Sequence, residues 1–196
     1  LTGSKLNYSL DFTAANFAAL GIDAGFDRTQ VATITFVADQ ANMGDTGTVA
    51  IEIKGMDFIP DTAGSAYVAA NVSTLPGSPV LAPPIGVNGG VITQTRTGIN
   101  NFSFTYTTNA ANQFVFTQIA DGYFQDSNND FIPDEPRVFI GATMSLGTTL
   151  VLAANGPNGK RLKVEVVDVT GKKADYYLVL TGSKLNYSLD FTAANF

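Results

Sequence analysis

Residues 1–17 read LTGSKLNYSLDFTAANF, and residues 180–196 read LTGSKLNYSLDFTAANF again. The two copies are identical at all 17 positions, and the second begins 179 residues after the first. Internal repetition is considered before other features, because it decides how the rest of the chain is divided. The 196 residues therefore divide into the first copy at 1–17, a central domain at 18–179 and the second copy at 180–196.

The duplicated segment has the alternation of a half-buried β-strand. Apolar and polar side chains alternate over residues 5–12, which gives a strand one apolar face and one polar face. After it, Thr13 is placed to cap a short helix over Ala14–Leu20 that ends at Gly21. The candidate interaction-strand residues are the apolar ones: Leu6, Tyr8, Leu10 and Phe12 in the first copy, and Leu185, Tyr187, Leu189 and Phe191 in the second.

Three origins would produce such a repeat. The chain can be one window of a tandem array of repeats of 179 residues, a domain to which a copy of its first strand was appended by engineering, or a filament subunit that spans a repeat boundary. An overlap with no biological role is the plain alternative. Because the chain begins with Leu rather than Met, we expect it to be a fragment or a processed product.

The region between the two copies consists of short strand-like runs separated by turns. Leu75–Gly90, rich in Pro and Gly, is expected to be a loop or an extended crossover. The acidic stretch Asp121–Pro136 is expected to be a loop, and Asn155–Gly159 a turn. This pattern predicts an all-β fold: an antiparallel β-sandwich, Ig-like or jelly-roll-like, of about ten to twelve strands. The expected strands between the copies are Val31–Ala38, Thr48–Lys54, Ala66–Val72, Val91–Thr97, Phe102–Thr107, Gln113–Ile119, Val138–Met144, Thr148–Ala153, Lys160–Val169 and Asp175–Leu180.

Two identical strands cannot both fill one position in one sandwich. The surplus strand stays free, or it fills the same position in a neighbouring unit by β-augmentation. The terminal strand is therefore expected to be exchanged or shared between neighbouring units. This arrangement resembles the donor strands of pilus subunits and the interdomain strands of tandem surface adhesins. The resemblance implies that the main partner of this chain is another copy of itself, joined head-to-tail.

A second motif lies at residues 126–135, which read DSNNDFIPDE. Calcium takes six to eight oxygen ligands, and alternate residues of a tight loop direct such oxygens to one centre. The motif resembles the calcium loops of EF-hands and thrombospondin type 3 repeats, above all the bacterial D-x-D-x-D-G-I-P-D form. It departs from them at Phe131, where the family has Gly, and at Arg137, where a bidentate Glu is expected. The candidate calcium ligands are Asp126, Asn128, Asp130, Ile132 through its carbonyl, Asp134 and Glu135; a solvated acidic loop is the alternative.

Composition excludes several classes of function. The 17 acidic and 11 basic residues give a net charge of −6, so nucleic acid and anionic membrane surfaces are disfavoured as partners. No apolar run approaches the roughly 18–20 residues that span a bilayer, so no membrane insertion is expected. The chain has no His and no Cys, which removes the usual general base and the thiol nucleophile. Asp45-Thr46-Gly47 matches the aspartic-protease tripeptide, but that chemistry needs two such carboxylates.

These features together predict a protein that is not an enzyme. We expect a structural subunit of an extracellular filament, or of a tandem-repeat adhesin at the cell surface, joined through the amphipathic strand and stiffened by calcium. The alternative is a β-sandwich module that binds a carbohydrate or another surface ligand. Its contact residues would be exposed tyrosines, with Tyr8, Tyr67, Tyr123 and Tyr176 as candidates for a surface glycan.

Overall fold

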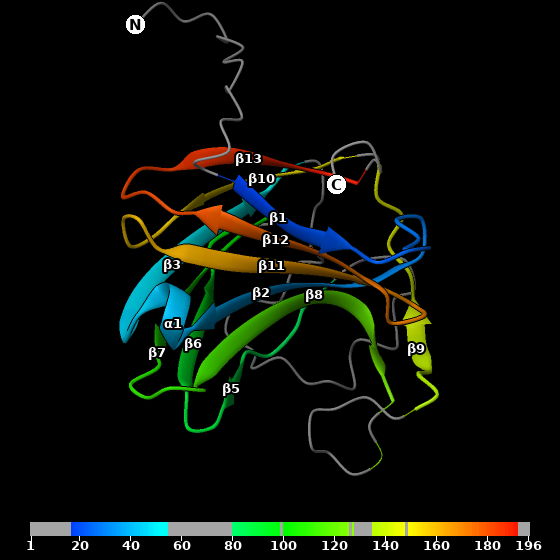
Figure 1. Ribbon diagram of the computed structural model, residues 1–196, viewed down its shortest axis with the longest axis horizontal. Helices are drawn as coiled ribbons and strands as arrows, with labels where there is room; N and C mark the ends of the chain where they lie inside the picture. The colour runs from blue at the N-terminus through cyan, green and yellow to red at the C-terminus, as the bar shows by residue number, and fades with distance from the viewer. Residues whose placement is uncertain are drawn as a thin grey trace, which may run out of the picture.

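Thirteen β-strands and one short helix make up the part of the chain that the computed structural model describes, which is residues 17–54, 80–98, 100–125, 127, 135–147 and 149–191 (Figure 1). The first sheet contains β1 Phe17–Ile22, β2 Val31–Asp39, β4 Val80–Leu81, β5 Ile85–Val87, β8 Phe114–Phe124, β9 Phe139–Ala142, β11 Arg161–Asp168 and β12 Lys173–Val179. The second contains β3 Thr46–Ile53, β6 Val91–Arg96, β7 Asn101–Thr107, β10 Thr149–Asn155 and β13 Leu185–Asp190. The helix is α1 Gln40–Met43.

The two sheets are antiparallel and pack face to face, which confirms the predicted all-β sandwich. The first sheet has the order β1-β12-β11-β2-β8-β4, with β5 and β9 also paired to β8, and the second has the order β13-β10-β3-β7-β6. Inward-facing aliphatic and aromatic side chains fill the space between the sheets. Phe36 of β2 meets Phe102 of β7 edge-to-face, with ring centroids 5.5 Å apart. The hydroxyl of buried Tyr106 donates a hydrogen bond to the carbonyl of Met43 at 2.8 Å, so its polar atom is not left unsatisfied.

The predicted helix over Ala14–Leu20 is wrong for the described residues, because Phe17–Ile22 forms strand β1. This strand pairs with β12 from Phe17 opposite Leu178 to Ile22 opposite Ala174. The ladder to β12 satisfies the backbone of an alanine-rich segment that a helix would otherwise suit. Gly21 does not stop a helix but lies at a bulge, where the register shifts and its φ is +146°.

Three further differences concern turns and loops. The predicted loop Leu75–Gly90 contains strands β4 and β5, both of which pair with β8. Strand β8 continues to Phe124, so Asp121 lies buried in a strand and not in the acidic loop. Helix α1 was not predicted; Asp39 caps it by accepting a hydrogen bond from the Asn42 backbone N–H at 2.9 Å. The expected strand Ala66–Val72 lies outside the described residues.

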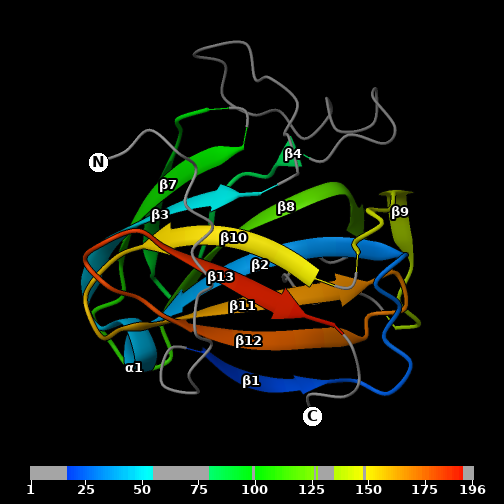
Figure 2. The same ribbon diagram turned by 90° about the horizontal axis from the view of Figure 1, so that it is seen from above.

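Strands β1 and β13 lie along the same margin of the sandwich and run in the same direction (Figures 1 and 2). β1 starts opposite Leu178, close to the 180–184 connection, and this end of the sandwich is the entry end. β13 runs away from that connection toward Phe191, whose ring contacts Phe26 at 5.9 Å. The end with Phe191 and the loop from Ile22 to Thr29 is the exit end.

Candidate functional site

The second copy of the repeat occupies the edge of the five-stranded sheet. Strand β13 is antiparallel to β10, with Leu185 opposite Ala154, Tyr187 opposite Leu152 and Leu189 opposite Leu150. β10 is in turn paired with β3, so β13 extends a ladder that continues into the middle of the sheet. The place beside β10 that β13 fills is called the β13 position.

The inward side chains of β13 are part of the hydrophobic core. Leu189 is 0% exposed, Tyr187 is 4% exposed and Phe191, just after the strand, is 7% exposed, while Leu185 packs partly buried against them. Asn186 and Ser188 on the other face are more exposed. Burial of such side chains stabilises a fold by about 1.5–3 kcal/mol each. The sandwich therefore depends on this strand for a substantial part of its core.

Two aromatic residues connect β13 to the opposite sheet. The hydroxyl of Tyr187 donates a hydrogen bond to the carbonyl of Val179 at 2.7 Å, and burial raises the pKa of Tyr187 to about 12. The Phe191 ring lies 5.9 Å from the rings of both Phe26 and Tyr176, edge-to-face with Tyr176. These contacts close the margin of the sandwich between β13 and β12, at both ends of the strand.

A charged contact fixes the beginning of the strand. The Lys184 ammonium forms an ion pair with Glu52 on β3, and Lys54 pairs with the same carboxylate. The hydrogen bonds from Lys184 and Lys54 lower the pKa of Glu52. Lys184 belongs to the repeat, since Lys5 is its equivalent in the first copy. The β13 position thus matches the repeat in its apolar face and in its leading charge.

The other predicted site residues are mostly outside the described part of the chain. This holds for Leu6, Tyr8, Leu10 and Phe12 of the first copy, and for Asp126, Asn128, Asp130, Ile132 and Asp134 of the candidate calcium loop. Glu135 is described: its side chain is largely exposed and accepts a hydrogen bond from Arg137 Nε at 3.1 Å. Among the described residues, no group of three or more acidic side chains is placed to hold a metal ion.

The structure does show how the acidic loop is held. Strands β8 and β9 pair antiparallel from Asp121 opposite Ala142 to Phe124 opposite Phe139. Beyond them the backbone N–H of Gln125 donates to the carbonyl of Val138 at 2.8 Å. The residues 126–137 therefore connect two paired strands, and the two ends of the connection are held together.

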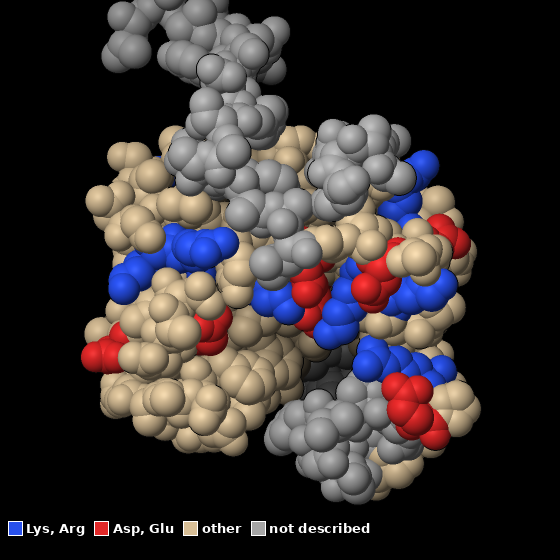
Figure 3. Space-filling model, in the orientation of Figure 1, with Lys and Arg blue, Asp and Glu red and all other residues tan. Residues whose placement is uncertain are grey.

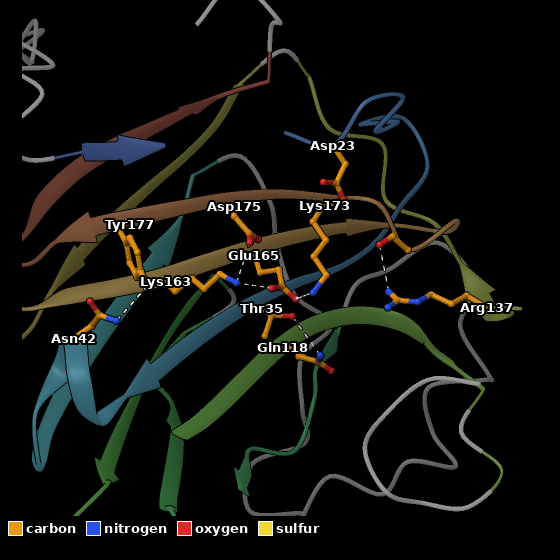
Figure 4. A network of polar contacts seen from close by, with 11 residues as sticks. Asp23, Thr35, Asn42, Gln118, Arg137, Lys163, Glu165, Lys173, Asp175 and Tyr177 are labelled. Atoms are coloured by element: carbon orange, nitrogen blue, oxygen red, sulfur yellow. Dashed lines mark hydrogen bonds and ion pairs between the residues drawn. The ribbon is translucent and has the colours of Figure 1, made fainter. Parts of the chain in front are cut away.

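A network of charges crosses the outer face of β11 and β12. Figure 3 shows Lys, Arg, Asp and Glu gathered in a band over this part of the molecule, and Figure 4 shows the side chains that form it. Lys163 Nζ lies 2.7 Å from Glu165 Oε2 and 2.9 Å from Asp175 Oδ2, and Lys173 Nζ lies 3.0 Å from Glu165 Oε1. These pairs connect β11 to β12, and β12 is the strand that pairs with β1 at the edge of the sheet.

The two carboxylates of this network have opposite pKa shifts. Burial acts to raise the pKa of Glu165, but the hydrogen bonds and charges of Lys163 and Lys173 outweigh it and the pKa is lowered. For Asp175 burial dominates and the pKa is raised, and its Oδ1 atom has no hydrogen-bond partner among the described residues. Burial acts to lower the pKa of Lys163, but the hydrogen bonds and charges of Glu165 and Asp175 outweigh it, and the pKa is raised. Lys163 therefore remains charged and pairs with its neighbours.

Sequence reasoning did not find the residues that shape the exit end. Asp168, fully buried, accepts hydrogen bonds from the backbone N–H groups of Asp27 at 2.9 Å, Thr170 at 2.8 Å and Lys172 at 3.1 Å. It thereby joins the β11–β12 turn to the loop after β1. Residues 168–172 read DVTGK, a composition typical of an Asx turn, so the turn could be predicted from sequence. The contact of Asp168 with Asp27 could not, because the two residues are far apart in the chain.

Of the tyrosines proposed for ligand contact, the structure shows one buried and one exposed. Tyr176 is fully buried in the core, so its proposed role as an exposed contact residue is wrong. Tyr123 is 59% exposed and lies opposite Ile140, which is also exposed.

No helix in the described ranges is long and apolar enough to cross a membrane. Comparisons with protein-family models, with curated proteins and with solved structures found no match.

Proposed function

We propose that this protein is a structural unit of an extracellular filament or of a tandem-repeat adhesin at the cell surface. Neighbouring units are joined head-to-tail through the amphipathic strand of the repeat. The observation that carries the proposal is that one copy of the repeat completes the sandwich, while an identical copy precedes the same sandwich. A strand with the same sequence as β13 is matched to the β13 position, and each sandwich offers that position once.

Two forms of linkage fit this observation. In a tandem array, the first copy is the last strand of the preceding unit in the same polypeptide. In a filament joined by strand exchange, the first copy of one chain takes the place of the second copy in the β13 position of another chain, by β-augmentation. Both forms use the same contacts: the ladder to β10, the apolar side chains beneath it and the ion pair of the leading lysine with Glu52.

The location of the native polypeptide tests the proposed function, and its mass before and after denaturation distinguishes the two forms of linkage. Antibodies against the sandwich are expected to label intact, unpermeabilised producing cells. After full denaturation, a tandem array is expected to run as one polypeptide that contains several 179-residue periods. An exchanged filament is expected to fall to single chains that carry one sandwich each, although the assembly is large before denaturation. A protein confined to the cell interior, and monomeric without denaturant, would contradict the proposal.

Calcium at residues 126–135 is the second part of the proposal. The backbone hydrogen bond from Gln125 to Val138 supports a calcium site, because this bond brings together the two ends of the segment that carries the acidic residues. Calcium would supply a positive charge that holds the carboxylates together and offsets part of the net charge of −6. A stiffened β8–β9 connection would then limit bending of each unit in an extended assembly.

Calcium is expected to raise the Tm of the chain, because a ligand bound only by the folded state stabilises it. At 100-fold excess over Kd the gain is about 2.7 kcal/mol, which corresponds to roughly 5–10 °C in Tm for a chain of this size. Calorimetry in calcium and in chelator measures the shift.

Asp130→Asn is expected to abolish the calcium shift. The sequence DFIPD of residues 130–134 also occurs at residues 57–61, so Asp57→Asn is the matched control and is expected to keep the calcium shift. Equal Tm values in calcium and in chelator for the unsubstituted chain would rule out a calcium site.

A further inference from the structure

We propose that the exit end of the sandwich is a docking surface for the entry end of a second copy of the same unit. Successive units would then stack end to end along the direction of their strands, as a stiff rod. This inference rests on the proposed function, and it adds to it the geometry of the junction and the residues that form it.

The two terminal strands, β1 and β13, run in the same direction. β1 runs from the end where Phe17 pairs with Leu178 to the end where Ile22 pairs with Ala174. β13 runs in the same direction as β1 (Figure 2). It leads the chain to Phe191, which packs against Phe26. The chain therefore enters a unit at one end and leaves it at the other. An assembly of such units grows lengthwise and does not fold back on itself.

The chain that connects two successive units is short. Phe196 is the repeat equivalent of Phe17, the first residue of β1, so only residues 192–195 separate Phe191 from the β1 of a following unit. Five Cα–Cα steps span at most about 18 Å. Phe191 is itself anchored, because its ring packs against Phe26 and Tyr176. The entry end of the next unit must therefore lie within about 18 Å of the exit end, close enough for the two ends to pack together.

The exit end is preformed by hydrogen bonds. The backbone N–H of Asp27 donates to Asp168 at 2.9 Å, that of Lys173 donates to the Asp23 carboxylate at 2.9 Å, and that of Leu146 donates to the carbonyl of Arg28 at 2.9 Å.

These bonds hold the loop around a pocket of about 360 Å³, whose lining includes Ile22, Ala24, Phe26 and Phe191. Three other segments fix the loop, so no ordering is needed when a second unit docks. The short linker supplies a high effective concentration of that unit.

The test is a two-unit protein, in which residues 1–196 continue directly into a second copy of residues 18–196. It is compared with the same protein carrying a flexible Gly/Ser insert of about eight residues after Ala194. Docked units are expected to give a rigid, elongated particle in small-angle scattering and a Tm about 3 °C above that of the protein with the insert. Equal Tm values together with a flexible scattering profile for both proteins would overturn the proposal.

A matched pair of substitutions locates the interface. Ala24 is exposed in the exit-end loop, and in the two-unit protein only the exit end of the first unit faces a neighbour. Ala24→Arg in the first unit is expected to remove the Tm gain, and the same substitution in the second unit is expected to leave it intact. Equal effects in both units would contradict docking at this end.

Failure of docking and failure of the proposed function give different results. Because the two-unit protein is covalently built, its behaviour does not depend on how cells assemble the chain. Two folded but independent units would overturn the docking surface alone. A native protein that is intracellular and monomeric, with a single sandwich per polypeptide, would overturn the proposed function alone.

Discussion

Leu189→Ala is expected to lower the free energy of unfolding by about 2–5 kcal/mol, whereas Leu10→Ala is expected to change it by less than about 0.5 kcal/mol. The two leucines occupy the same place in identical 17-residue segments, so the substitutions are chemically the same. Leu189 is fully buried opposite Leu150 and belongs to the core, and its truncation leaves a cavity between the sheets. The difference between the two variants therefore measures which copy fills the β13 position.

Urea unfolding followed by circular dichroism gives the free energies, and equal m-values show that the same surface is exposed on unfolding. The double variant Leu10→Ala/Leu189→Ala is the control for exchange between the copies. If Leu189→Ala alone has little effect but the double variant loses several kcal/mol, the first copy has replaced the damaged second copy. Equal losses for the two single variants would contradict the assignment of the second copy to the β13 position.

The strands that could be predicted from sequence are those whose local pattern agrees with their environment. Leu185, Tyr187 and Leu189 alternate with polar residues, and in the structure these three face the core while Asn186 and Ser188 lie on the other face. β1 could not be predicted in the same way, because FAALGI has no alternation and takes its strand conformation from pairing with β12. β4 and β5 lie in a segment rich in Pro and Gly and form only because β8 offers them an edge.

The candidate site shows the same division between local and distant information. Sequence alternation identified the apolar face of the repeat, but it could not identify what packs against Phe191. Phe26 is separated from Phe191 by most of the chain, and Tyr176 lies on β12 of the opposite sheet. Contacts of that kind depend on the order of the strands in the two sheets. Asp121 is a similar case: its acidic neighbours suggested a loop, whereas pairing with Ala142 places it in a buried part of β8. The five calcium-loop positions from Asp126 to Asp134 stay predictions from the motif.

Removal of residues 181–196 is expected to convert the chain into head-to-tail oligomers. The truncation leaves β10 without its neighbour and removes Tyr187, Leu189 and Phe191 from the core, so the sandwich is incomplete. The first copy of another chain carries the same side chains and can complete it, with the ladder to β10 restored. Light scattering over a range of concentrations is expected to show masses that grow by whole chains, since each added chain fills one position and offers one strand.

Two further truncations make this result decisive. Without residues 1–16 the chain keeps its own β13, so it is expected to remain a folded monomer at every concentration. Without both segments, no strand is left for the β13 position; the chain is expected to be unfolded, and a synthetic peptide of residues 181–196 to restore the fold. A folded monomer from the chain lacking only residues 181–196 would show that the first copy completes its own sandwich. Head-to-tail linkage would then fail, because a strand held within its own unit is not available to a neighbour.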